Sequence, residues 1–475
     1  MRPTLEILLE ICQCSEKVRS YFEVIHRENE RLTAENAELR ARVNQSSTNS
    51  SKPPSSSPFV KPKSLRVKTG RKPGGQPGHK GSTLQVKETP DVVVEHTVDT
   101  CSYCGCDISM EAATDRQTRQ VVDVQIVPVV TGHCAQSKTC PVCGKETSAA
   151  FPQEVDHYIQ YGDTFSAIII CLNKGNYIPY DRLSKISKDI LGIPVSSGTL
   201  VNIVHECGKS LKDSMEYIKD QLKQASVVHF DETGNRVKGK NQWLHSAGNE
   251  RFTYVETHAK RGSAATDEIG ILPVFEGTAI HDFWKSYYKY LGCKHALCNA
   301  HILRELTGIT ENFNQIWSEH MKALLVEIKR SVEAAGRVLT LPETTGFEAR
   351  YDELLILGDK ENPIEMDTLT QRNIRGRTAR SKARNLLDRM KLYKQDILKF
   401  MVDPAIPFDN NLAERDIRMS KLQQKISGGF RSDEGNDAFD NIRSYISTAT
   451  KQGISMFESI RAAVAGKPLF TAENH

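Results

Sequence analysis

The chain has 475 residues, of which 39% are hydrophobic, so it is long enough for several folded units with apolar cores. Its formal net charge of +4 is too small to indicate a nucleic-acid partner by itself. No apolar run reaches the roughly 18–20 residues of a membrane span, and the first residues lack the pattern of a secretory signal. Twelve cysteines without such a signal predict a reducing, cytoplasmic compartment, in which thiols bind metal or stay free.

Residues 1–45 carry a heptad pattern. Apolar residues recur every seven positions at d, namely Ile11, Val18, Ile25, Leu32 and Leu39. The a positions include Asn29 and Asn36, and a buried Asn at a fixes the register and favours a two-stranded coil. The pattern predicts a coiled coil that joins two or more copies of the chain. The alternative is a single amphipathic helix packed on the rest of the protein.

Residues 46–90 are rich in Ser, Pro and Gly and contain too few large apolar residues to fold by themselves. No acid lies between Glu38 and Glu88, whereas Lys72 and Lys80 are two of several cations there. A flexible basic linker of this kind neutralises DNA phosphates without recognising sequence. The alternative is a solvated tether with incidental charge, and the two interpretations are compatible.

Residues 91–150 contain two CxxC pairs, each followed by Gly. The four cysteines are Cys101, Cys104, Cys140 and Cys143. Each pair places two thiolates on one side of a tight turn, and two such turns complete a tetrahedral structural Zn²⁺ site. Cys106, Cys134 or His133 could replace one of these ligands. A redox CxxC is the competing interpretation, and the presence of two matching pairs disfavours it.

Residues 151–222 are predicted to be helical. One helix is expected to end near Ile190, and the next is expected to be capped at Ser196 or Ser197 after a turn through Gly192 and Pro194. This is a helix-turn-helix pattern, which predicts a DNA-binding domain. Plain helical packing is the alternative, because the second helix offers few side chains suited to base recognition.

Residues 223–302 contain short apolar and alternating runs separated by Gly- and Asn-containing turns. The expected strands are 227–230, 242–247, 252–257, 277–281 and 294–298, followed by a helix that starts at His301. The first three are predicted to form an antiparallel meander. This order of elements predicts the first part of a ribonuclease-H-like catalytic core within an α/β multidomain protein.

Three acidic residues stand where this core would bring them together. Asp231 and Asp282 each follow an apolar run and are predicted to end strands, while Glu414 lies in a segment with helix-start chemistry. Carboxylates from two neighbouring strands and one helix can converge on two Mg²⁺ or Mn²⁺ ions. Such a pair of ions suits phosphodiester chemistry, in which one activates the attacking oxygen and the other stabilises the leaving oxygen.

Residues 303–400 are predicted to be a helical insertion between Asp282 and Glu414, and residues 401–475 complete the core with a C-terminal helix. Within the insertion, 371–391 is densely basic, which suits either contact with a polyanion or a solvated helix face. The cations expected to hold phosphates after Glu414 are Arg415, Arg418, Lys425 and Arg431.

Cys298 and His301 have the spacing of metal ligands at the start of the predicted helix. No second pair of ligands lies nearby in the sequence. We therefore expect His301 and Arg304 to pack or to position DNA near the catalytic metals, and we disfavour a second zinc site.

Several motifs in chain order resemble the insertion sequence 66 family of transposases. They are GGQPGHKG at 74–81, the paired CxxC module, HFDETG at 229–234, HDFWKSYY at 281–288, CNAHILREL at 298–306, PFDNNLAERDIR at 407–418 and KISGGFRS at 425–432. The resemblance spans nearly the whole chain and implies a DDE enzyme with Asp231, Asp282 and Glu414 as its metal-binding triad. It implies cutting at the inverted ends of a mobile DNA element and joining of the 3'-hydroxyls to target DNA, in association with the nucleoid. Some relatives also work with accessory proteins encoded by the same element.

Two other functions share parts of this pattern. A ribonuclease-H-like nuclease would use the same triad to cut DNA without joining it, and the many predicted DNA-binding segments favour the transposase. A zinc-containing, coiled-coil DNA-binding regulator would carry an inert triad, which should tolerate Asp231→Asn without phenotype. A tyrosine recombinase is more distant, because it would form a phosphotyrosyl link that DDE chemistry excludes.

Overall fold

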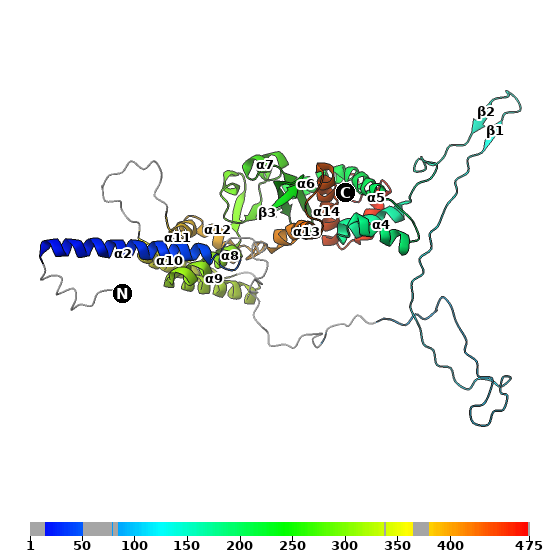
Figure 1. Cartoon of the computed structure of the whole chain (residues 1–475), viewed down its shortest axis with the longest axis horizontal. Coiled ribbons are helices and arrows are strands. Elements are labelled where there is room, and N and C mark those ends of the chain that lie inside the picture. The colour runs from blue at the N-terminus through cyan, green and yellow to red at the C-terminus, as the bar shows by residue number, and fades with distance from the viewer. Residues whose placement is uncertain (1–14, 51–77, 79–83, 337–338, 364–379, 474–475) are drawn as a thin grey trace.

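The computed structural model of the protein describes residues 15–50, 78, 84–336, 339–363 and 380–473 (Figure 1). Helix α2 (Glu16–Val43) confirms that the heptad segment is helical from Glu16, while Ile11 lies outside the described residues. The apolar a and d positions of α2 are exposed, namely Val18, Phe22, Ile25, Leu32, Leu39 and Val43. Helix α2 contacts α8 (Asn299–Phe313) and its Ala41 is buried, while these a and d positions stay exposed.

The predicted linker begins later than expected, because residues 46–50 pack against α8 (Asn299–Phe313). Asn49 Nδ2 donates a hydrogen bond to Glu311 Oε2 at 3.1 Å. The backbone of Asn49 lies so close to α8 that a Cβ on Gly308 would be 2.1 Å from the Asn49 carbonyl oxygen. A Ser- and Asn-rich turn can pack in this way because its side chains satisfy its own backbone, as Asn49 Oδ1 does for Ser46 N at 2.8 Å.

Residues 84–160 follow an extended and largely exposed path. Their regular structure is one short antiparallel hairpin, β1 (Ser137–Thr139) with β2 (Glu146–Ser148). Figure 1 shows this hairpin far from the sheet and the packed helices. The segment therefore contributes little to the apolar core.

Helices lie within residues 163–223, whereas residues 151–162 of the region 151–222 that was predicted to be helical contain no helix. The helical region contains α3 (Asp163–Ile170), a π-helical turn (Cys171–Gly175), α4 (Tyr180–Asp189), α5 (Ser197–Ser210) and α6 (Lys212–Lys223). Ser196 caps α5, because its hydroxyl accepts a hydrogen bond from Thr199 N at 3.1 Å. One face of α5 packs against α14 (Asp433–Lys451), and a Cβ on Gly208 would lie 2.6 Å from Ala438 Cα. The helical region is therefore docked closely on the C-terminal part of the chain.

A five-stranded mixed sheet forms the centre of the protein, in the order β5-β4-β3-β6-β7. Its strands are β3 (Val227–Val237), β4 (Lys240–Gly248), β5 (Thr253–His258), β6 (Thr278–His281) and β7 (Lys294–Leu297). Strands β3, β4 and β5 form the predicted antiparallel meander, whereas β6 and β7 add in parallel to β3. The β3–β4 turn is tight because Lys238 and Gly239 both have positive φ, of 50° and 73°.

Helices cover the sheet and form two large apolar cores with it. The larger core joins β3, β4 and β5 to the helical region, to α14 and to α15 (Met456–Val464). Helix α13 (Asn411–Ser427) lies against β3 and β4. Helix α7 (Ser263–Ile269) contacts the 3-10 turn Leu272–Val274, and Lys289 of the 3-10 turn Tyr287–Lys289 donates from Nζ to Ser263 Oγ at 2.7 Å. The second core continues from β6 and β7 into the insertion.

The predicted helical insertion is confirmed in its described residues. After α8 it contains α9 (Ile316–Ala334), α10 (Leu341–Glu361), α11 (Lys382–Leu392) and α12 (Lys394–Val402), packed around the buried Trp317. Residues 371–379 of the basic segment 371–391 lie outside the described residues. Its described arginines pair with acids, since Arg384 contacts Asp359 and Asp388, and Arg389 contacts Glu305. These side chains hold the insertion together and do not form a free cationic face.

Across the described ranges, no helix is both long and apolar enough to cross a membrane.

Candidate active site

Asp231 lies inside β3 and not at its end, contrary to the prediction. The strand continues because the polar residues after Asp231 still pair with β4, where Asp231 is opposite Ser246. Strand β6 pairs only with the first part of β3, as far as His229 opposite Ile280, and Asp282 follows soon after. Asp231 and Asp282 therefore lie at the same edge, where two parallel strands separate.

Burial raises the pKa of both aspartates. For Asp231 burial is the main cause, and repulsion from Glu232 and Asp282 adds to it, with a smaller share from Glu414. For Asp282 burial is again the main cause. Each carboxylate accepts one backbone hydrogen bond, from Glu232 N to Asp231 Oδ1 and from Trp284 N to Asp282 Oδ1, both at 2.9 Å. No other donor from the described residues bonds to them, so each keeps an oxygen available to a cation.

Glu414 lies in the first turn of α13, as predicted. Asn410 precedes this helix and donates from Nδ2 to the Phe230 carbonyl at 2.9 Å, which ties the start of α13 to β3. The Glu414 carboxylate is 3.6 Å from Arg304 Nη2 and 3.7 Å from Arg418 Nη2. These distances suit ion pairs but are too long for hydrogen bonds, so the two arginines attract the carboxylate without fixing its orientation.

Glu232 is a fourth acid at this edge that the sequence interpretation missed. Its side chain is only 2% exposed, and burial followed by repulsion from Asp282 raises its pKa to about 7. Its Oε1 accepts hydrogen bonds from Arg261 Nε at 3.1 Å and Nη2 at 2.6 Å, and its Oε2 accepts one from the Tyr287 hydroxyl. Both of its oxygens are therefore engaged, which distinguishes Glu232 from the two aspartates.

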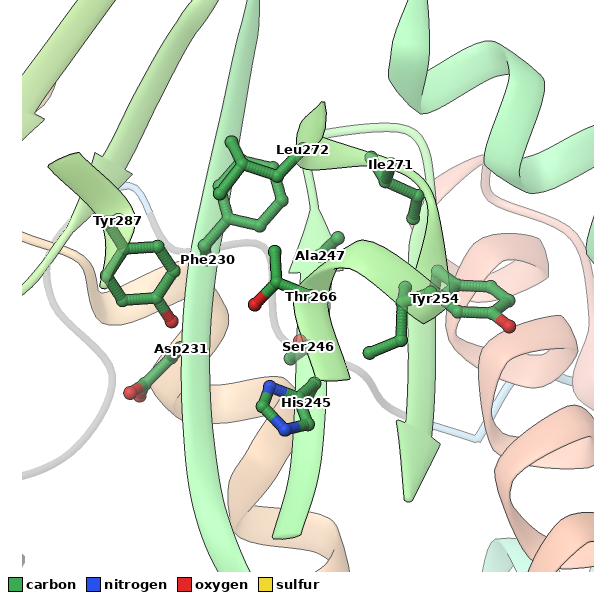
Figure 2. A pocket seen from close by; sticks show the side chains of 11 residues that line it. Phe230, Asp231, His245, Ser246, Ala247, Tyr254, Thr266, Ile271, Leu272 and Tyr287 are labelled. Carbon is green, nitrogen blue, oxygen red and sulfur yellow. The ribbon is translucent and has the colours of Figure 1, made fainter. Parts of the chain in front are cut away.

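A small pocket opens beside Asp231 under α7 (Figure 2). Figure 2 shows Asp231 and Tyr287 near one another at one end of it, with His245 also close to Asp231. The rest of the lining is mainly apolar and includes Phe230, Ala247, Tyr254, Ile269, Ile271 and Leu272. Burial lowers the pKa of His245 to about 4, so this ring is neutral at physiological pH.

The three predicted carboxylates suit a hard divalent cation. Asp282 and Glu414 both repel the Asp231 carboxylate, so negative charge gathers around Asp231. Carboxylate oxygens are the donors that Mg²⁺ and Mn²⁺ take. Among the residues that the structure describes, no three His, Cys, Asp or Glu side chains are already gathered in the arrangement of a metal site. A cation would therefore have to draw these carboxylates together.

The two CxxC segments form matching turns. Gly105 N donates to the Cys101 carbonyl and Gly144 N donates to the Cys140 carbonyl, both at 2.9 Å. The two glycines have φ of 74° and 71°, which lets each turn close. Backbone hydrogen bonds within each turn are the main cause that lowers the pKa of the Cys104 and Cys140 thiols.

The structure does not bring the four predicted zinc ligands together, since no metal-binding group of three is found in the described ranges. All six cysteines of this segment, including Cys106 and Cys134, are free of disulfides. The sulfurs of Cys104 and Cys106 are 3.3 Å apart, and His133 is exposed. The chemistry of the donors still fits zinc, because both turns present thiols and one thiol in each has a lowered pKa.

The predicted DNA contacts differ in their surroundings. Lys72 and Lys80 lie outside the described residues. Burial lowers the pKa of His301 to about 3, and its Nδ1 is buried without a hydrogen-bond partner, so a direct phosphate contact through this ring is disfavoured. Arg304 is turned toward Glu414. The exposed members of the predicted set are Arg415, Arg418, Lys425 and Arg431.

Comparisons with known proteins cover the region that holds this site. The model of the Transposase IS66 family matches residues 159–438, which include Asp231, Asp282 and Glu414. A second model, Family of unknown function (DUF6444), matches residues 8–85.

A shorter match links the chain to an uncharacterized protein, y4jO, of Sinorhizobium fredii (strain NBRC 101917 / NGR234). The two are 36% identical over 72 residues, which are 15% of this chain and 22% of that protein. The chain thus matches about a fifth of the length of this relative.

Proposed function

The chain belongs to the IS66 family of transposases, whose model covers more than half of it, and from this premise we propose that Asp231, Asp282 and Glu414 are the catalytic triad of a DDE transposase. The reaction is metal-dependent cleavage at the ends of a mobile DNA element, followed by transfer of the 3'-hydroxyl ends into target DNA. The observation that carries the proposal is that Asp231 on β3, Asp282 directly after β6 and Glu414 in the first turn of α13 lie near one edge of the sheet, where Asp282 and Glu414 both repel the Asp231 carboxylate.

The sheet supports this assignment. Strand β3 is central, with the antiparallel strands β4 and β5 on one side and the parallel strands β6 and β7 on the other. This is the order expected of a ribonuclease-H-like core. In such a core the first acid lies on the central strand and the second follows the neighbouring parallel strand. Asp231 and Asp282 occupy these two positions.

Asp231, Asp282 and Glu414 would hold Mg²⁺ or Mn²⁺. When bound, these ions supply stabilisation of the attacking and leaving oxygens of a phosphodiester. The protein contributes the burial of the two aspartates, which strengthens their interaction with a cation, and the backbone hydrogen bonds from Glu232 N and Trp284 N that orient them.

DNA would approach along α13. Its exposed cations Arg415, Arg418 and Lys425 extend away from Glu414 along the helix, and Arg431 follows in the next loop. Such cations position a DNA backbone by phosphate contacts, which carry no sequence information. The helix-turn-helix formed by α4 and α5 would add a second contact, through the face of α5 that is not packed on α14.

The N-terminal regions would assemble and position the enzyme. The exposed apolar stripe of α2 has a heptad spacing with Asn29 and Asn36 at a, which suits a second copy of this chain as its partner. Cys101, Cys104, Cys140 and Cys143 would hold a structural Zn²⁺ once the two turns meet. Measurement of zinc in purified wild type, Cys104→Ser and Cys134→Ser tests this: we expect loss of zinc only in Cys104→Ser, and equal zinc in all three would contradict the ligand set.

The test of function is a strand-transfer assay with purified protein, element-end DNA and Mg²⁺, comparing wild type with Asp282→Asn. Joined products from wild type alone support the transposase. Nicks without joining favour a nuclease. Equal DNA binding by both proteins, with no reaction from either, favours a DNA-binding regulator with an inert triad.

A further inference from the structure

Arg261 lies between the elements that carry the two catalytic aspartates. It follows β5, and its guanidinium carbon lies 4.5 Å from the centre of the Trp243 ring and 3.9 Å from that of the Trp284 ring. The side chain is 39% exposed, so the two indoles cover much of it. Contacts of an arginine with two aromatic faces restrict its position, since the planar guanidinium stacks on rings.

The same guanidinium holds Glu232. Arg261 donates from Nε and Nη2 to Glu232 Oε1, at 3.1 and 2.6 Å, and the Glu232 side chain is buried. Charge-assisted hydrogen bonds to a buried carboxylate are strong, because the alternative is an unpaired buried charge. The guanidinium of Arg261 is therefore held by two contacts, with Glu232 on β3 and with Trp284 after β6.

Both partners of Arg261 also support an aspartate through the backbone. The amide of Glu232 donates to Asp231, and the amide of Trp284 donates to Asp282, each at 2.9 Å. We propose that Arg261 is a positioning residue, which fixes Asp231 and Asp282 relative to each other by joining Glu232 to Trp284. The inference rests on the proposed function of the two aspartates.

The competing role for Arg261 is that of a positive charge alone. A lysine would keep that charge but would lose the fork that reaches Glu232 and the planar contact with the indoles. Positioning therefore predicts that Arg261→Lys behaves like Arg261→Gln, whereas a charge effect predicts that it behaves like wild type. Lys260→Gln is the matched control, because it removes an exposed charge from the neighbouring residue.

The first measurement is hydrogen–deuterium exchange of metal-free, full-length protein, read from peptides that cover residues 281–290. We expect faster exchange there in Arg261→Lys and Arg261→Gln, and wild-type exchange in Lys260→Gln. Circular dichroism melts identify any variant that is globally unfolded. If Arg261→Gln is unfolded, the exchange of Arg261→Lys alone decides between positioning and a charge effect. Unchanged exchange in a folded Arg261→Lys would overturn the proposal.

The second measurement is Mn²⁺ binding, which is monitored through the electron paramagnetic resonance signal of the free ion. We expect both Arg261 variants to bind about tenfold more weakly than wild type, the lower end of what loss of an outer-shell partner costs. Tighter or unchanged binding in Arg261→Lys would contradict positioning. Asp282→Asn separates the metal site from the role of Arg261. If this variant leaves Mn²⁺ binding unchanged, the proposed metal site is wrong. Altered exchange in the Arg261 variants would still support the role of Arg261 in joining Glu232 to Trp284.

Discussion

Asn410 and His229 are joined by a hydrogen bond of 2.7 Å between Asn410 Oδ1 and His229 Nδ1, and both side chains are buried. Because Asn410 Nδ2 donates to the Phe230 carbonyl, its Oδ1 is the acceptor and His229 Nδ1 carries the proton. Asn410 N also donates to Cys298 Sγ at 3.2 Å. The start of α13 is thus tied both to β3 and to the residue that follows β7.

Asn410→Ala is expected to lower the free energy of unfolding by about 1–3 kcal/mol, because it leaves buried polar groups of His229 and Phe230 without partners. Strand transfer should fall further than this loss of stability explains, since Glu414 no longer has a fixed position. Urea unfolding and strand-transfer assays at a temperature where the variants are folded measure the two effects. Asn411→Ala, at an exposed neighbouring position, is the control. Full activity in Asn410→Ala would show that Glu414 does not depend on this tie.

Asp282→Asn is expected to stabilise the metal-free protein at neutral pH. Burial raises the pKa of Asp282 in the folded state. Ionising this group at neutral pH therefore costs more free energy in the folded protein than in the unfolded chain, which lowers the free energy of unfolding. Removing this cost is expected to raise Tm. Thermal melts in a chelator measure it, with Glu250→Gln at an exposed turn as the control. The difference should shrink toward pH 4, and a lower Tm for Asp282→Asn at pH 7 would refute the expectation.

Lys174 is expected to make the free energy of unfolding depend on pH in the alkaline range. Burial lowers the pKa of this 4% exposed lysine from 10.5 to about 8, although Asp440 opposes the shift. Between these values the unfolded chain binds more protons than the folded one, so the free energy of unfolding rises with pH. The contribution is up to about 3 kcal/mol. Urea unfolding from pH 7 to 10.5 should show this rise in wild type and Lys209→Met but not in Lys174→Met, and parallel curves for wild type and Lys174→Met would contradict it.

Gly208→Ala is expected to weaken the docking of the helical region on α14. An added Cβ would meet the Ala438 backbone at 2.6 Å, and such overpacking costs about 1–3 kcal/mol. Gly198→Ala is the matched control in the same helix, since its Cβ would meet only Ser196 Oγ at 3.7 Å. Chemical denaturation of both variants checks the difference, and equal stabilities would argue against close packing of α5 on α14.

The sheet was predictable from sequence because its strands are short apolar runs between turn residues. The prediction ended the first strand at Asp231, because the following Glu-Thr-Gly-Asn is polar and typical of a turn. In the structure Asn235 and Val237 are buried and keep β3 extended. Tertiary packing of this kind overrides local preference.

Glu232 and residues 46–50 were missed for related reasons. Because the predicted strand ended at Asp231, Glu232 was assigned to no strand and was not expected at the site. Only the structure brings Arg261 and Tyr287 to Glu232, from positions far along the chain. For residues 46–50, composition indicated a linker, and the close approach of Asn49 to Gly308 depends on a contact that composition does not encode.

The most direct test of the central claim is a change of metal preference. Replacing Asp282 with Cys exchanges a hard oxygen ligand for a sulfur, which Mg²⁺ rejects and Mn²⁺ tolerates better. Strand transfer is measured for wild type, Asp282→Cys and Asp282→Ala in each metal. The account predicts that Asp282→Cys is inactive with Mg²⁺ and partly active with Mn²⁺, while Asp282→Ala is inactive with both. Wild-type activity of Asp282→Ala in Mg²⁺ would contradict a metal-binding role for Asp282.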